Sequence, residues 1–122
     1  MGATIGTLPS NSRSLRKDSF FGFEPKTGYF GDKKPGNEAN VRVIQTDGDP
    51  MELAKSTFNQ LSLGGQLYSD DGNRITYILQ DGAYITIRRI TKSGPPAVEI
   101  SVKRVKDTAG IKSQKIHFIK KG

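Results

Sequence analysis

His117 lies in the C-terminal segment KIHFIK, two residues after Lys115. The imidazole of histidine gives and takes protons near neutral pH, and lysine ammonium groups bind phosphates and stabilise negative charge. Because side chains alternate between the two faces of a β-strand, Lys115 and His117 are predicted to point to the same face. Together they could move a proton next to a bound anion.

The same alternation places more polar side chains on this face. In three earlier segments, RITYILQ, AYITIRRI and AVEISVK, polar residues alternate with apolar ones. The predicted polar face comprises Thr76, Tyr84, Thr86, Arg88, Glu99, Ser101, Lys103, Lys115 and His117. Its histidine can transfer protons, its cations can hold a phosphate, and its hydroxyls can orient both. These groups suit the cleavage of RNA through its own 2′-hydroxyl, which requires a base, an acid and positive charge but no protein nucleophile.

Each of these residues also has a plainer interpretation. A lone histidine on a basic strand is more often a surface or packing residue than a catalyst. Arg88 and Lys103 could simply be solvated, and Glu99 could pair with a cation of the next strand for about 0.2–1 kcal/mol. The candidate catalytic residues of this face are His117, Arg88, Lys115, Thr86 and Ser101.

A helix is predicted directly before these segments. Asp49 is a typical N-cap residue, and Pro50 suits the first helical position. Apolar residues recur at i, i+4 and i+7 along MELAKSTFNQLSL, and the segment ends at the pair Gly64-Gly65. This pattern is typical of a helix that packs one face against a sheet.

The strand predictions define the rest of the fold. VRVIQT favours a short strand at an edge of the sheet, and Asp81-Gly82 favours a tight hairpin between the segments RITYILQ and AYITIRRI. The predicted fold is α+β, with an N-terminal helical segment packed on a four- or five-stranded antiparallel sheet. Residues 41–122 form this domain, because 122 residues with 34% hydrophobic content provide one modest core.

Composition restricts the partners. The formal net charge is +7, and residues 101–122 hold seven basic residues against one aspartate. Such a balance favours a polyanionic partner, either nucleic acid or an acidic protein. The chain has no cysteine and one histidine, so neither disulfides nor a tight metal site are expected and no cofactor is predicted. Asp70, Asp71 and Glu99 leave a weak Mg²⁺ site open.

Residues 1–40 are rich in Gly, Ser, Pro, Asn and Lys and have no sustained period. We expect a partly irregular linker or a segment used for entering a target cell, although the aromatic cluster in SFFGFEPKTGYFG could dock on the domain. The sequence has no apolar run of membrane-spanning length and no signal peptide pattern. Stable association with a membrane is therefore not expected.

Three motifs, GGQLYSDDGN, QDGAYITIRRITKSGPPAVEI and GIKSQKIHF, lie in order within residues 41–119. This stretch resembles the C-terminal toxin domains of bacterial polymorphic toxins, including those of contact-dependent growth inhibition systems and LXG-type secreted toxins. Such domains belong to the barnase, EndoU, colicin and RelE superfamily, whose members place a helical segment before a small antiparallel sheet and mostly cleave RNA, often tRNA.

The resemblance also implies site residues. The family pattern of a basic residue with Ser, then Pro, then an acidic residue corresponds to Lys92-Ser93, Pro96 and Glu99, where the family more often has Asp at the last position. The closing motif corresponds to Lys112, Gln114, Lys115 and His117. With the predicted polar face, the candidate substrate-binding residues are Lys92, Ser93, Glu99, Lys103, Lys112, Gln114 and Tyr84.

The resemblance further implies a biological setting. Such domains are secreted or delivered from the cell surface as parts of larger effectors and act in the cytoplasm of target bacteria. A cognate immunity protein neutralises them, and an acidic one would suit this basic chain. The expected function is an antibacterial toxin domain that cleaves RNA, above all tRNA, by metal-independent transesterification.

Two other functions remain open. One is a DNase toxin of the same delivery class, which the weak Mg²⁺ site would serve. The other is a non-catalytic module that binds nucleic acid or protein, which the basic charge would suit. The sequence lacks the repeated aromatic pattern of an RNA-stacking platform, which argues against the second.

Overall fold

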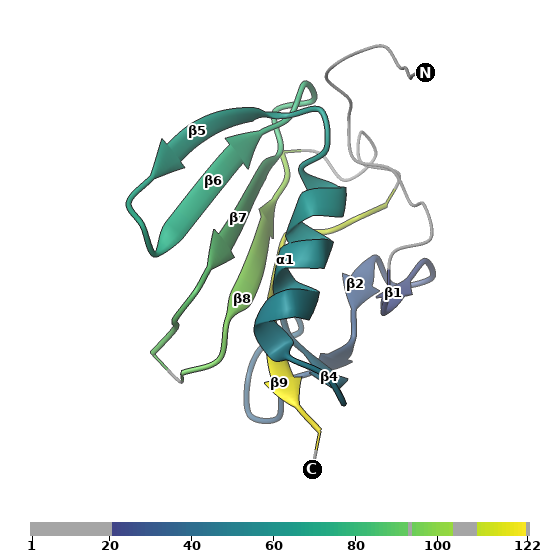
Figure 1. Cartoon of the computed structure of the whole chain (residues 1–122). Coiled ribbons are helices and arrows are strands. Elements are labelled where there is room, and N and C mark those ends of the chain that lie inside the picture. The colour runs from purple at the N-terminus through teal and green to yellow at the C-terminus, as the bar shows by residue number, and fades with distance from the viewer. Residues whose placement is uncertain (1–20, 93, 104–109, 122) are drawn as a thin grey trace, which may run out of the picture.

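One helix packs on a seven-stranded sheet in the computed structural model, which describes residues 21–92, 94–103 and 110–121 (Figure 1). Helix α1 spans Pro50–Leu61. The sheet contains β3 (Asp32–Lys33), β4 (Val41–Thr46), β5 (Gln66–Asp70), β6 (Arg74–Ile78), β7 (Tyr84–Arg88), β8 (Ala97–Ser101) and β9 (Gln114–Lys120). A separate hairpin pairs β1 (Phe23–Glu24) with β2 (Tyr29–Phe30). The predicted α+β class is confirmed.

The predicted helix start is confirmed in detail. The Asp49 carboxylate accepts a hydrogen bond from the backbone N–H of Met51 at 3.0 Å, and Pro50 occupies the first turn. Ala54, Phe58 and Leu61 are buried against the sheet, so the i, i+4, i+7 stripe forms the inner face of α1. Among the described residues no helix combines the length and apolar character needed to cross a membrane.

The sheet is larger than predicted and mixed rather than purely antiparallel. Its strand order is β3-β4-β9-β8-β7-β6-β5, and β4 runs parallel to β9 while the other neighbours are antiparallel. The prediction that VRVIQT forms an edge strand is therefore wrong, because β4 lies between β3 and β9. A parallel pair needs a long crossover, and here the chain supplies it with α1 and the strands β5 to β8.

The alternation along β7, β8 and β9 separates two faces as predicted. Ile85, Ile87, Val98, Ile100, Ile116 and Phe118 are buried in the core. Helix α1 contacts β4, β7, β8 and β9 on this side, and the β5–β6 hairpin extends beyond it (Figure 1). The other face of the sheet is not covered by the helix.

Part of the segment predicted as a linker is built into the fold. Phe30 is fully buried in the core, and its ring lies 5.1 Å from that of Phe23. The aromatic cluster thus docks on the domain through these two residues. Residues 1–20 lie outside the part of the chain that the structure describes.

Gln114 ties this hairpin to β9. Its side chain accepts a hydrogen bond from the N–H of Phe30 at 2.7 Å and donates to the carbonyls of Gly28 at 3.0 Å and Lys112 at 2.7 Å. The side chain lies on the core side of β9 and is 4% exposed. Its evident role is to satisfy buried backbone groups.

Gln114→Ala is expected to lower the free energy of unfolding by about 1–3 kcal/mol, because it removes the buried bonds of the Gln114 side chain to the backbone of Phe30, Gly28 and Lys112. Urea denaturation would measure the loss. The matched control is Gln45→Ala on β4, where the glutamine is exposed. Equal stability of the two variants would contradict the anchoring role.

Candidate functional site

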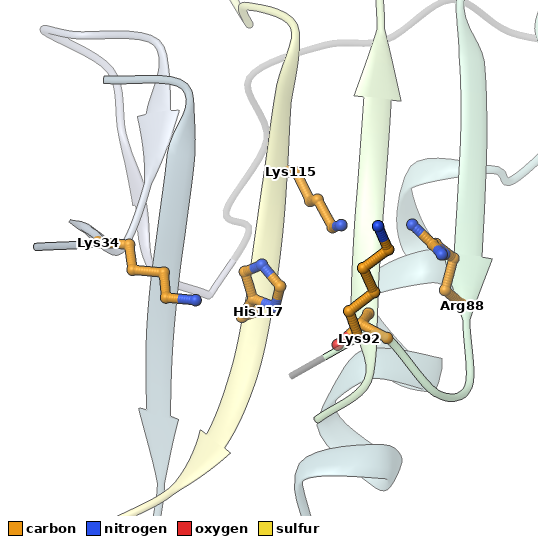
Figure 2. Close-up of a pocket in the computed structure, with 6 residues that line it drawn as sticks. Lys34, Arg88, Lys92, Lys115 and His117 are labelled. Carbon is orange, nitrogen blue, oxygen red and sulfur yellow. The ribbon is translucent and has the colours of Figure 1, made fainter. Parts of the chain in front are cut away.

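A pocket of about 420 Å³ opens on the sheet face opposite α1. It is lined by Lys34, Arg88, Thr91, Lys92, Lys115 and His117. In Figure 2 the Lys34 side chain reaches toward His117 from one side, and the ends of Lys92, Lys115 and Arg88 gather on the other. Four cations thus surround one imidazole.

The register of three strands positions the pocket. Arg88 on β7 and His117 on β9 are both Cα partners of Ala97 on the intervening strand β8. Since neighbouring strands lie about 4.8 Å apart, the backbones of Arg88 and His117 are separated by roughly 10 Å. Ala97, the residue between them on β8, is small and fully buried.

Two loops complete the lining. Lys34 follows β3, and its backbone N–H donates to the carbonyl of Val41 at 2.8 Å, which holds it beside β4. Lys92 lies in the β7–β8 loop, next to Thr91, whose hydroxyl donates to the carbonyl of Pro95 at 2.8 Å. These two hydrogen bonds to backbone carbonyls hold in place the loop segments from which the Lys34 and Lys92 side chains extend.

His117 is 6% exposed, and its Nδ1 is buried without a hydrogen-bond partner among the described residues. Burial lowers the pKa of the imidazole below its ordinary value, and the positive charges of Lys34, Lys115 and Arg88 lower it further, against the opposing effect of Glu99. The imidazole is therefore neutral at pH 7. A neutral imidazole can accept a proton.

Glu99 links two of the cations. Its Oε2 lies 3.2 Å from Nη1 of Arg88 and 3.9 Å from Nζ of Lys115. Because Glu99 pairs with only two of the four cations that line the pocket, the pocket keeps an excess of positive charge. Nε of Arg88 is also buried and unpartnered among the described residues. Buried polar atoms usually have a hydrogen-bond partner, and both of these nitrogens belong to residues that line one pocket.

The structure brings several of the predicted residues together. Arg88, Lys92, Lys115 and His117 line the pocket, and Glu99 bonds to two of them. Thr86 is on the predicted face, but its hydroxyl is buried and bonded to that of Thr76 at 2.8 Å, so it does not line the pocket.

Other predicted residues lie elsewhere. Ser101 and Tyr84 are Cα partners farther along the sheet, and Lys103 lies beyond them beside Gly82. Lys112 rests against the ring of Tyr29, with Nζ 5.1 Å from its centroid. Gln114 points into the core, as described above, and so cannot contact a ligand in the pocket. Ser93 lies outside the described residues.

Lys34 and Thr91 line the pocket but were not predicted as site residues. Lys34 fell within the predicted linker, and it reaches the pocket because β3 and β4 add to the sheet beside β9.

Within the described ranges, no three His, Cys, Asp or Glu side chains come together as a possible metal site. No protein-family model matches the chain, and no curated protein or solved structure is significantly similar to it. The case for a function therefore rests on the residues of the pocket.

Proposed function

We propose that this chain is a metal-independent ribonuclease that cleaves RNA at a phosphate held in the pocket of Lys34, Arg88, Lys92 and Lys115. The observation that carries the proposal is a buried, neutral imidazole with an unpartnered nitrogen, surrounded by four cations. The cations fit a phosphodiester, and the imidazole fits the removal of a proton beside it.

His117 takes the proton from the 2′-hydroxyl of the substrate. The 2′-oxygen then forms a bond to phosphorus, and the bond from phosphorus to the 5′-oxygen breaks. Arg88 and Lys115 stabilise the charge that develops on the phosphate oxygens. The ammonium groups of Lys92 and Lys115 are donors available to the departing 5′-oxygen. The products carry a 2′,3′-cyclic phosphate and a 5′-hydroxyl.

Glu99 helps to arrange the cations. Because Oε2 of Glu99 contacts both Arg88 and Lys115, it holds the two side chains near each other before a phosphate binds. An anionic substrate would then share these cations with the carboxylate. This positioning role requires no proton transfer by Glu99.

The resemblance of residues 41–119 to polymorphic toxin domains extends the proposal. On that basis the chain is the ribonuclease domain of a larger, secreted antibacterial effector, and tRNA in the cytoplasm of target bacteria is its substrate. An acidic immunity protein would neutralise the domain by covering the cationic pocket.

Incubation of the purified chain with tRNA in excess EDTA tests the proposal. We expect cleavage products with 2′,3′-cyclic phosphate ends, and no cleavage at a position where a single deoxyribose replaces the ribose, because the attacking hydroxyl is then missing. Plasmid DNA should remain intact.

Three outcomes would overturn this function. Activity that disappears with EDTA would indicate a metal-dependent nuclease, and cutting of plasmid DNA would indicate a DNase. Binding of RNA that weakens steeply with salt, without any product, would indicate a non-catalytic module.

A further inference from the structure

Two tyrosines form a pair on the same sheet face as the pocket. The rings of Tyr68 on β5 and Tyr84 on β7 lie 5.0 Å apart at an interplanar angle of 71°. Tyr84 and Arg88 are four residues apart on one strand, so they share a face. Tyr68 is 62% exposed, which leaves much of its ring open to solvent.

A β-bulge explains how Tyr68 reaches this face. The register of β5 with β6 shifts between Leu67 and Ser69, and Tyr68 is the extra residue. Leu67 is the partner of Tyr77, whose ring contacts Phe58 on the helix side. Leu67 therefore belongs to the helix side of the sheet, while Tyr68 meets Tyr84 on the other.

We propose that the Tyr68–Tyr84 pair is a stacking subsite for one unpaired base of a single-stranded nucleic acid whose phosphate occupies the cationic pocket. The subsite rests on the proposed function only through that phosphate site. Binding at the subsite does not require cleavage.

The distance between the two sites suits one short strand. Tyr84 and Arg88 are four residue steps apart along β7, a distance of about 13 Å. Thr76 and Thr86 lie between them on this side of the sheet, where both residues are buried and their hydroxyls bond to each other. Glu99 on β8 is the Cα partner of Thr86 beside this path, and its carboxylate is bonded to Arg88 and Lys115. Two cations thus balance its charge, and a flexible strand can place a phosphate at one end and a base at the other.

The charges around the tyrosines favour a nucleic acid. The four cations of the pocket lie toward one end of the face, and Lys103 lies beside Gly82 at the end near Tyr84. Cations that follow a backbone, together with an open aromatic ring, are the features by which proteins bind single strands without reading their sequence. A base in a duplex presents no free face to stack, so the ligand is single-stranded.

The experiment compares two fluorescein-labelled DNA strands of equal length, one with bases and one abasic, by fluorescence anisotropy at low salt. Deoxyribose strands have no 2′-hydroxyl, so cleavage does not interfere. The wild-type chain is expected to bind the strand with bases roughly fivefold or more tightly than the abasic strand. Tyr68→Ala should remove this preference and leave binding of the abasic strand unchanged.

Two variants act as controls. Tyr68→Phe keeps the ring and should keep the preference. Leu67→Ala removes a neighbouring side chain that is 58% exposed on the other face and should also keep it. A preference that persists in Tyr68→Ala would overturn the subsite, as would an equal loss of affinity for both strands.

The same set of variants separates this subsite from the proposed function. If the wild-type chain cleaves no RNA but shows a base preference that depends on Tyr68, the ribonuclease is rejected and the subsite stands. If RNA is cleaved and no base preference depends on Tyr68, the subsite alone is rejected.

Discussion

His117→Ala is expected to reduce kcat/KM for RNA cleavage by about 10²–10⁴-fold, the usual contribution of a positioned acid or base. The imidazole is the only one in the chain, and it lines the pocket beside four cations. Its removal leaves phosphate binding in place but removes the acceptor for the 2′-hydroxyl proton. Initial rates on a short RNA with one cleavage site would measure the loss.

His117→Gln is the matched variant, because it keeps a polar side chain at this position without a group that titrates near neutral pH. It should lose as much activity as His117→Ala, while both variants bind a 2′-deoxy strand as the wild-type chain does. Full activity in either variant would exclude His117 from the reaction.

The pH dependence of this reaction tests the assigned role of His117. Burial and the neighbouring cations lower the pKa of His117 below the ordinary histidine value of about 6.5. A base must be unprotonated, so kcat/KM should rise with pH through a midpoint below the ordinary histidine value and then level off. The rise should be absent from the residual activity of His117→Ala. A rate that falls as pH increases through this range would assign His117 the role of acid.

Arg88→Ala is expected to lower kcat by about 10²–10³-fold, comparable to the loss of one donor to a developing negative charge. Arg88 lines the pocket across Ala97 from His117, and its Nε is buried without a partner in the described part of the chain. Arg88→Lys should recover only part of the rate, because an ammonium group lacks the planar fork that matches a phosphate. Single-turnover rates at saturating chain would measure the rate constant of the cleavage step, and multiple-turnover rates at saturating RNA would measure kcat.

Arg74→Ala is the control for Arg88→Ala. Arg74 is the exposed Cα partner of Arg88 on β6, one strand farther from His117, and it does not line the pocket. Its loss should leave kcat nearly unchanged. The loss of Arg88 also leaves the Glu99 carboxylate without one of its cations. The double variant Arg88→Ala, Glu99→Gln shows whether this uncompensated charge causes the loss of kcat. Full recovery of kcat in the double variant would contradict direct stabilisation of the phosphate charge by Arg88.

Alternation along strands predicted much of the candidate site. Because strand side chains have a period of two, Lys115 and His117 could be assigned to one face from spacing alone. The same rule places Gln114 on the opposite face, three residues from His117. The resemblance had instead grouped Gln114 with the site, and the structure places it in the core.

The parts of the fold and of the site that the sequence does not predict depend on contacts between segments far apart in the chain. Lys34 joins the pocket through the parallel pairing of β4 with β9, and no local pattern indicates which strand a distant strand will pair with. QLYSD, which forms β5, does not alternate apolar and polar residues, so its sequence does not predict a strand. Thr86 was assigned to the correct face, but its bond to Thr76 forms only once β6 and β7 pair.

The position of β9 determines when the pocket can exist. β9 supplies Lys115 and His117 and lies between β4 and β8, so the two parts of the sheet join only when residues 114–120 have been synthesised. Pairings between segments so far apart in the chain also form slowly. A growing chain on the ribosome therefore carries separate, inactive pieces of the pocket, and the RNA around it is safe from the proposed activity until synthesis has passed β9.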